Sequence, residues 1–333
     1  MLDNILKKPI LPSNQSPHCI LYSTRPGALP ARFRRERVLI VGCGDVGLRV
    51  AQALSARVRR LALTSSSGRI VELRSHGITP LRGNLDAPPS LRRLAGVATR
   101  VIHLAPPPGE GWGDPRTLAL TRALRQRSLP LSLVYGSTSG VYGDCQGEVV
   151  VETRPSHADT ARAARRIDAE HSIRFLGRAT PVRVGILRIP GIYASDREGG
   201  TPHARLEKGM LVLQASDDVF TNHIQADDLA RACVAALWRG KPQRVYNVND
   251  DTCLKMGDYF DLAADLYGLP RPRRIPRNSA RNQLSLMLLS FMSESRRMDN
   301  TRLKRELRLK LRYPTVDVGL LPPVDVHQVK KAA

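Results

Sequence analysis

The chain has 333 residues, 42% of them hydrophobic, and a formal net charge of +22. This length allows one two-lobed domain with a substantial core, and the lack of any run of 18 apolar residues argues against a membrane span. The 43 arginines and nine lysines are dispersed rather than gathered in one block, so the charge does not lead us to predict a nucleic-acid partner.

The N-terminal residues 1–33 are rich in proline and serine, and they lack the apolar segment and cleavage site of a secretory signal. We therefore predict a poorly ordered extension. Five widely spaced cysteines contain no C-x-x-C pair, which argues against a zinc centre or a disulfide framework. The reducing cytoplasm is the predicted location.

Apolar runs alternate with segments of helical periodicity from residue 37 onward. The predicted strands span residues 37–42, 59–65, 78–84, 100–106, 131–139, 181–190 and 244–250. The predicted helices span residues 46–57, 69–77, 90–97, 117–128, 159–176, 227–240, 256–269 and 300–309. This alternation predicts an α/β fold with a doubly wound parallel sheet of the Rossmann type.

The alternation breaks after Pro190, and this change sets the predicted domain boundaries. Residues 34–250 are expected to form an NAD(P)-binding domain, from which 191–226 contribute to a second lobe. Residues 251–320 are expected to form this smaller C-terminal lobe and to bind the substrate. Residues 321–333 are interpreted as a tail.

The segment "VLIVGCGDVG" carries three glycines in the spacing G-x-G-x-x-G after a strand and at the start of a helix. Gly42 permits a tight turn, Gly44 lets a pyrophosphate approach the backbone, and Gly47 lets the helix pack closely on the sheet. The free amides and the positive end of the helix dipole favour phosphate. The loop therefore predicts dinucleotide binding.

The end of the second strand bears on the choice of coenzyme. An acidic residue about 20 positions after the loop holds the ribose of NAD, but no Asp or Glu lies between Asp45 and Glu72. Thr64 and Ser65 stand there instead, with Arg69 close behind. Hydroxyls and a guanidinium suit a 2′-phosphate, so NADP is favoured over NAD; the alternative is that Arg69 is simply an exposed helix residue.

Five further stretches follow in a characteristic order: "RGNLD" (82–86), "VIHLAP" (101–106), "YGSTSGVYGD" (135–144), "LRIPGIY" (187–193) and "TNHIQADDLA" (221–230). With the glycine loop they resemble the extended and atypical short-chain dehydrogenase/reductases, the NAD-dependent epimerase/dehydratase family. The resemblance covers roughly residues 37 to 320. It implies an NAD(P)-dependent oxidoreductase or epimerase that transfers hydride on an unidentified small polar substrate.

The glycine loop and these motifs together define the predicted coenzyme site. The resemblance implies that "VIHLAP" lines the nicotinamide ribose, that "LRIPGIY" meets the nicotinamide, and that Asn84 takes the adenine-side place where the family usually has Asp. The predicted coenzyme-binding residues are Gly42, Cys43, Gly44, Asp45, Val46, Gly47, Thr64, Ser65, Arg69, Asn84, Leu85, Leu104, Ala105, Pro106 and Ile189.

The predicted catalytic residues depart from the family pattern. The resemblance places Thr138 at the active-site Ser/Thr position, and it places Arg162 and Arg166 where the family has the Tyr and Lys of Tyr-x-x-x-Lys. Arginine cannot exchange a proton near neutral pH. Arg166 can still bond a ribose, and Arg162 can pair with an acidic substrate. The alternative is that both lie on a solvated helix face.

A different residue must therefore donate the proton if the chain is an enzyme. Tyr142, Tyr193 and His157 lie near the expected cleft, and Tyr142 is included in the predicted catalytic set, although its ring also suits burial. His223, Asp227 and Asp228 show no metal-ligand spacing, so no metal is predicted. The two aspartates are expected to cap a helix beginning near Leu229.

Two functions remain open at this stage. The altered Tyr and Lys positions leave a non-catalytic NADP-binding regulator or scaffold as the alternative to an enzyme, because a fold does not guarantee chemistry. The expected partner is a small molecule, and a homodimer is compatible with the sequence.

Overall fold

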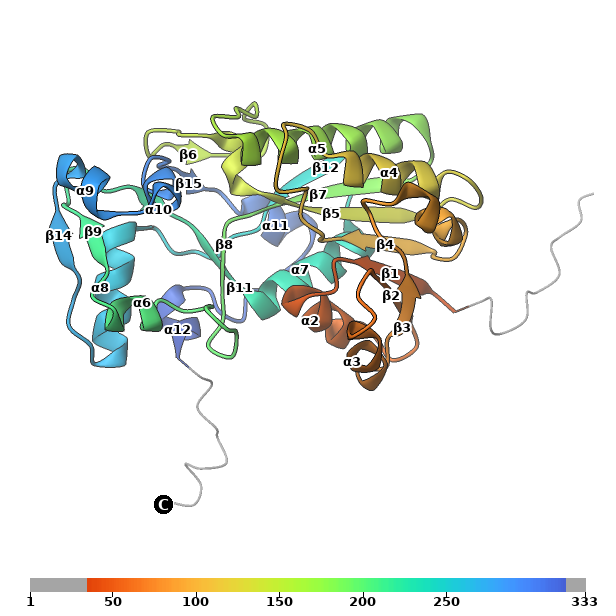
Figure 1. The fold of residues 1–333 in the computed structure, drawn as a ribbon, viewed down its shortest axis with the longest axis horizontal. Helices are drawn as coiled ribbons and strands as arrows, with labels where there is room; N and C mark the ends of the chain where they lie inside the picture. Colours follow the sequence, from red (N-terminus) through yellow and green to blue (C-terminus); the bar gives the residue numbers. More distant parts are fainter. Residues whose placement is uncertain (1–34, 322–333) are drawn as a thin grey trace, which may run out of the picture. The chain divides into compact units, whose positions relative to one another are not determined.

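The computed structural model describes residues 35–321. Seven parallel strands form one sheet in the order β12-β7-β5-β4-β1-β2-β3 (Figure 1). They are β1 (Arg37–Val41), β2 (Arg59–Thr64), β3 (Thr79–Arg82), β4 (Arg100–His103), β5 (Ser132–Thr138), β7 (Arg183–Ile189) and β12 (Arg244–Asn247). The seven predicted strands and the doubly wound α/β fold are therefore confirmed.

Successive residues of each strand pack into two different hydrophobic cores, one on each face of the sheet. In β1, Val38 and Ile40 enter one hydrophobic cluster, whereas Leu39 and Val41 enter the other. This alternation follows from the strand period of two, and a sheet covered on both faces needs apolar residues on both. The unbroken apolar run "VLIV" is thus explained by its central place in the sheet.

Helices cover both faces of the sheet. Figure 1 shows α2, α3 and α7 on one side and α4 and α5 on the other. Their bounds are α2 (Asp45–Ala53), α3 (Arg69–Ser75), α4 (Pro115–Leu124), α5 (Ala161–Ala179) and α7 (Ala226–Arg239). The segment predicted as a helix over 90–97 is a 3-10 helix, η1 (Pro88–Leu94), with two prolines in its first turn.

The C-terminal half adds small elements around its own hydrophobic clusters. The predicted helices over 256–269 and 300–309 are α8 (Met256–Tyr267) and the shorter α11 (Thr301–Glu306). The remaining elements were not predicted: η2 (Ser139–Tyr142), β6 (Val149–Val150), β8 (Gly191–Tyr193), α6 (His203–Glu207), β9 (Leu211–Leu213), β10 (Phe220–Thr221), β11 (His223–Gln225), β13 (Leu254–Lys255), β14 (Arg273–Ile275), α9 (Arg277–Gln283), α10 (Leu286–Phe291), β15 (Arg297–Met298) and α12 (Val316–Leu320).

The cap of α7 differs from the sequence prediction. The side chain of Gln225 caps this helix by accepting hydrogen bonds from the amides of Asp227 and Asp228. Asp228 is buried and instead accepts from the backbone amides of Arg312 and Tyr313. The prediction that the two aspartates cap the helix was wrong, because Gln225 reaches the first turn from the preceding strand.

A buried ion pair ties the centre of the sheet to α5. The Arg188 guanidinium of β7 donates to both carboxylate oxygens of Glu170, at 3.1 and 2.8 Å. The Ser137 hydroxyl of β5 donates to the same carboxylate at 2.7 Å. Both charged side chains are almost fully buried. An unpaired buried charge costs far more than an exposed one, so this pair is essential to the packing of α5.

We predict that Glu170→Ala lowers the free energy of unfolding by about 3–5 kcal/mol, because it leaves the Arg188 charge buried without its partner. Urea unfolding followed by circular dichroism measures the change. Asp265→Ala, which breaks the exposed Arg271–Asp265 pair, is the control and should leave the midpoint nearly unchanged. Equal effects of the two substitutions would contradict the importance given to the buried pair.

Candidate functional site

The turn after β1 is packed directly against the end of β4. The Leu104 and Ala105 amides both donate to the Val41 carbonyl, at 2.7 and 3.0 Å. Gly42 has a φ of +88°, and a Cβ on it would lie 2.3 Å from the Ala105 nitrogen. Only glycine fits at this position, since both the backbone conformation and the space exclude a side chain.

Gly44 and Gly47 are constrained differently from Gly42. A Cβ on Gly47 would lie 2.9 Å from the Gly42 carbonyl oxygen, so this glycine allows α2 to pack on the turn. A Cβ on Gly44 would have no atom within 4 Å. Gly44 precedes α2 without a side-chain cap, which leaves the first amides of the helix available to a ligand. The geometry fits a dinucleotide whose phosphates rest against the bare backbone.

Asp45 is the first residue of α2, beside the expected phosphates. Its carboxylate is paired with Arg49 at 3.1 Å and with Arg197 at 3.3 Å. Arg49 also bonds Asp196 and Asp227, at 2.7 and 2.6 Å. These ion pairs offset a negative charge that would otherwise oppose phosphate binding, and they join the glycine loop to the loop after β8.

The end of β2 carries the predicted ribose-side residues. Thr64 ends the strand, Ser65 is exposed, and Arg69 starts α3, where it donates to the Cys43 carbonyl at 2.6 Å. Arg69 is therefore more than an exposed helix residue. The register pairs Thr64 with Arg82 of β3, an exposed arginine that sequence reasoning missed.

The remaining predicted coenzyme residues lie nearby along the same edge of the sheet. Asn84 is exposed and uses its side-chain oxygen to accept from the Asp86 amide, and Leu85 is half-buried. Burial raises the pKa of the Cys43 thiol to about 11, so its side chain is an uncharged packing group. Val46 and Ile189 pack into the core cluster beside the turn.

A cavity of about 630 Å³ opens at the carboxyl ends of β5 and β7. The predicted residues Pro106, Thr138, Arg162 and Arg166 all line it. The other wall comes from the C-terminal half, including residues of α8 and α10. Ligands bind at this edge of a doubly wound sheet, so the cavity is the candidate substrate site.

The two arginines that the resemblance places at the family's Tyr and Lys positions differ in their contacts. Arg166 is half-buried and donates to the Gly136 carbonyl at 2.9 Å and to the Tyr135 hydroxyl at 3.1 Å. Arg162 is exposed, with its guanidinium 4.6 Å from the centre of the Phe291 ring of α10. Neither arrangement is that of an arginine on a fully solvated face, which was the alternative considered for both.

Of the other predicted proton donors, Tyr142 and His157 are not among the residues that line the cavity. The Tyr142 hydroxyl is buried and donates to the Asn247 side chain at 2.7 Å. The Thr138 hydroxyl oxygen accepts from the Gly140 amide, and its hydrogen is available because it donates to no group within residues 35–321. Tyr193 lines the cavity, but burial and then the nearby Asp250 raise the pKa of its phenol. The placement therefore supports Thr138 over Tyr142.

His223 also lines the cavity and is stacked on Tyr259, with ring centroids 4.1 Å apart. Burial and then the Arg205 charge lower the pKa of His223 to about 3, and burial raises the pKa of Tyr259. His223 is therefore a neutral imidazole at neutral pH and a weak base. It can form a hydrogen bond with a substrate, but it does not carry the extra proton that a general acid must donate.

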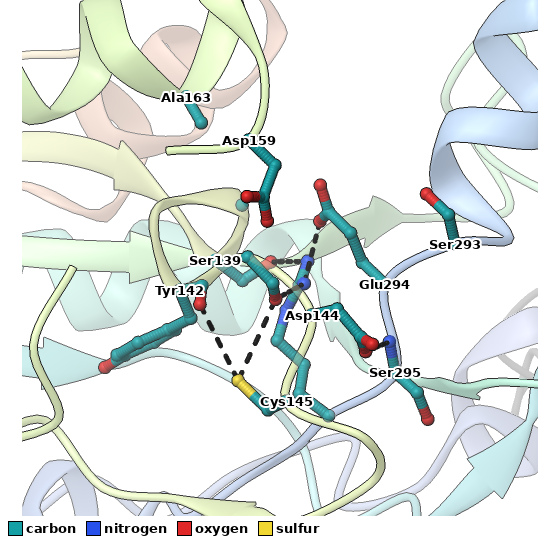
Figure 2. A network of polar contacts seen from close by, with 12 residues as sticks. Ser139, Tyr142, Asp144, Cys145, Asp159, Ala163, Ser293, Glu294 and Ser295 are labelled. Carbon is teal, nitrogen blue, oxygen red and sulfur yellow. Dashed lines mark hydrogen bonds and ion pairs between the residues drawn. The ribbon is translucent and has the colours of Figure 1, made fainter. Parts of the chain in front are cut away.

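Sequence reasoning missed two charged residues of the cavity wall. Glu294 and Arg296 follow α10 and form a buried ion pair at 2.7 Å. Figure 2 shows the guanidinium between the Glu294 carboxylate and Ser139, which follows Thr138 at the end of β5. No local motif signals these residues, because about 155 positions separate Arg296 from Ser139 and Gly143, the residues after β5 to which it donates.

Residues 35–321 contain neither a group of metal ligands nor a membrane-spanning helix. No three or more His, Cys, Asp or Glu side chains are grouped so that they could hold a metal ion. No helix in this part of the chain is long and apolar enough to cross a membrane.

Comparison with known proteins gives a family. The model of the "NAD dependent epimerase/dehydratase family" matches residues 38–249. No curated protein matches the chain.

Three solved structures are similar to this chain over most of its length. A functionally unknown conserved protein from Silicibacter pomeroyi is 28% identical, with 86% of this chain and 96% of that chain covered and a TM-score of 0.70. A nucleoside-diphosphate-sugar epimerase from Pseudomonas aeruginosa is 19% identical (89% and 98% covered, TM-score 0.71). The UDP-glucuronic acid 4-epimerase from Bacillus cereus, in complex with UDP-glucuronic acid and NAD, is 20% identical (85% and 96% covered, TM-score 0.66). The last two likenesses establish the fold.

The buried His223 predicts a pH dependence of stability. Its pKa is lower in the folded than in the unfolded chain, so the unfolded chain takes up a proton first and stability falls as the pH drops below about 6.5. We expect His223→Gln to lose about 2 kcal/mol less of its unfolding free energy between pH 7 and pH 5 than the wild type does. Urea titrations at both pH values test this, with the exposed His76→Gln as the control. An unchanged pH dependence would show that His223 protonates in the folded protein.

Proposed function

Because the chain belongs to the NAD-dependent epimerase/dehydratase family and is thus a nicotinamide-dependent enzyme, we propose that it is an oxidoreductase or epimerase acting on an anionic polar substrate, with sugar nucleotides as the first class to test. The observation that carries the proposal is a cavity at the carboxyl ends of β5 and β7 that is lined by five arginines and a single carboxylate. The bound coenzyme supplies hydride transfer, and the protein supplies orientation and electrostatics.

The charges of the cavity support an anionic substrate. Its five arginines are Arg162, Arg165, Arg166, Arg205 and Arg296, and Glu294 is its one acidic residue. Guanidinium groups pair well with phosphate and carboxylate, often through two parallel hydrogen bonds. Such a surplus of positive charge in a partly enclosed site favours a ligand with two or more negative charges.

The wall opposite the sheet supports the proposed division into lobes. Met256, Tyr259 and Phe260 of α8 and Phe291 after it face the cavity from the region 251–320. Apolar and aromatic side chains of this kind suit the less polar part of a ligand. We therefore assign substrate contact to this C-terminal lobe and coenzyme binding to residues 34–250. The homodimer and the cytoplasmic location stay predictions.

The experiment that tests the function follows the absorbance of the reduced nicotinamide with UDP-glucuronic acid, UDP-glucose and UDP-N-acetylglucosamine as probes. Turnover or reduction of bound coenzyme is expected with at least one probe. Gly44→Ala should weaken coenzyme binding roughly tenfold or more without loss of thermal stability, because its added methyl group meets only the phosphates.

A negative result favours the second candidate. Tight coenzyme binding without reaction of any probe would point to the non-catalytic NADP-binding regulator, which the arginines at 162 and 166 motivate. Absence of calorimetric heat with either coenzyme would reject both.

We further propose that NADP is preferred over NAD. Arg69 and Arg82 flank the end of β2. Arg69 donates to the Cys43 carbonyl and pairs with Glu72 at 3.1 Å, whereas the side chain of Arg82 makes no hydrogen bond or ion pair with residues 35–321. No carboxylate lies between the end of β2 and the start of α3 to hold an unphosphorylated ribose, and the two guanidinium groups there can receive a 2′-phosphate.

The double variant Arg69→Ala/Arg82→Ala is expected to raise the Kd of NADPH at least about tenfold and to leave that of NADH nearly unchanged, since each charged hydrogen bond contributes about 1.5–3 kcal/mol. Fluorescence titration with both reduced coenzymes measures the difference. Arg93→Ala, an exposed arginine of η1, is the matched control. Tighter binding of NADH than of NADPH by the wild type would contradict the preference.

A further inference from the structure

Hydride transfer on an alcohol or carbonyl needs a group that exchanges a proton, and position 162 does not provide one. The titratable groups that line the cavity, apart from its arginines, are Tyr193, His223, Tyr259 and Glu294. Burial holds both phenols protonated and the imidazole neutral, as their pKa directions show. A carboxylate is the remaining group in the cavity that can accept and return a proton.

Glu294 stands in the right part of the cavity for this role. Arg296 donates to it at 2.7 Å, and the other terminal nitrogen of the same guanidinium lies 3.5 Å from the Ser139 hydroxyl. Only one guanidinium therefore separates the carboxylate from the end of β5. Thr138, the proposed active-site hydroxyl, directly precedes Ser139 and is the last residue of β5.

The ion pair is held firmly from two sides. Arg296 also donates to the Gly143 carbonyl at 2.8 Å, which fixes its guanidinium against the turn after β5. The Ser295 amide donates to Asp144 at 2.8 Å, which fixes the backbone between the two charged residues. Glu294 is 8% exposed, so its carboxylate is largely removed from water while its residue still faces the cavity. Such preorganisation is what an acid–base residue requires.

We propose that Glu294 is the acid–base residue of this enzyme and replaces the missing tyrosine. In the oxidative direction the substrate hydroxyl gives its proton to the Glu294 carboxylate as the carbon gives its hydride to the oxidised nicotinamide coenzyme, and a carbonyl forms. In the reductive direction the proton passes from Glu294 back to the substrate oxygen, and the hydride returns to the carbonyl carbon. This assignment rests on the proposed function, because the coenzyme is the hydride acceptor.

The charges around Glu294 determine how it responds to a ligand. Arg296 pairs with it, and Arg162 of α5 is stacked on Phe291, three residues before it. Asp159, in the turn before α5, is the nearby acidic group drawn with it in Figure 2, and Asp144 is engaged with the Ser295 amide. A phosphate-bearing ligand adds negative charge to the cavity that this ion pair lines.

The test is calorimetric titration of the holoenzyme with UDP-glucuronic acid near pH 6, in buffers of different ionisation enthalpy. Binding by the wild type should take up a fraction of a proton, and Glu294→Gln should bind the same probe without this uptake. Glu152→Gln is the matched control: Glu152 is a buried carboxylate paired with Arg302 outside the cavity, so its replacement should leave the uptake unchanged.

The same variants are then compared in turnover of a probe that the wild type converts. Glu294→Gln should lower kcat by about 10²–10⁴-fold while the coenzyme Kd changes little, and Glu294→Asp should recover part of the rate. Probe binding with equal proton uptake in the wild type and Glu294→Gln overturns the assignment and leaves the proposed function intact. No binding of the probe to the wild type overturns the anionic site itself, and the assignment with it.

Discussion

The contact between the turn after β1 and the end of β4 is the constraint from which the site is built. Both Leu104 and Ala105 donate to the Val41 carbonyl, and Gly42 leaves no space between the two chain segments. At this point the strand order reverses, because β1 lies between β2 and β4 in the sheet. Helices after β1 and β4 therefore diverge to opposite faces and leave a crevice between them. We propose that the coenzyme phosphates bind at Gly44, on this crevice, and that the substrate cavity lies at the ends of β5 and β7.

Arg162 and Arg166, which the resemblance sets at the usual Tyr and Lys positions, give this cavity a permanent positive charge. A lysine in the usual place acts by depressing the pKa of its tyrosine, a function that has no meaning when position 162 cannot lose a proton. The Arg166 guanidinium instead donates to the Gly136 carbonyl of β5. The Arg162 guanidinium lies over the Phe291 ring of the C-terminal lobe. Positive charge for substrate binding and acid–base capacity are thus assigned to different residues.

The strands, most helices and the glycine turn could be predicted because they depend on local patterns. The unbroken run at Val38–Val41 predicts a strand buried on both faces, and the glycine spacing predicts the turn. Glu294 and Arg296 could not be predicted, since their place arises from hydrogen bonds of Arg296 to Ser139 and Gly143, which no local pattern encodes. The same holds for Arg82, which acquires its place only through the β2–β3 register. The α7 cap was missed because Gln225 is a less common capping residue than aspartate.

The large positive charge is used locally rather than as one binding surface. Arg188 and Arg296 are buried in ion pairs, and Arg49 joins three aspartates from different segments. An arginine can satisfy carbonyl and carboxylate oxygens together because its planar group has five donors in fixed directions. Arg49 and Arg188 join elements away from the cavity, whereas Arg296 lines it and also ties the segment after α10 to the turn after β5 through the Gly143 carbonyl. Arg296 therefore serves both purposes at once: it holds two distant segments together and adds to the positive charge of the cavity.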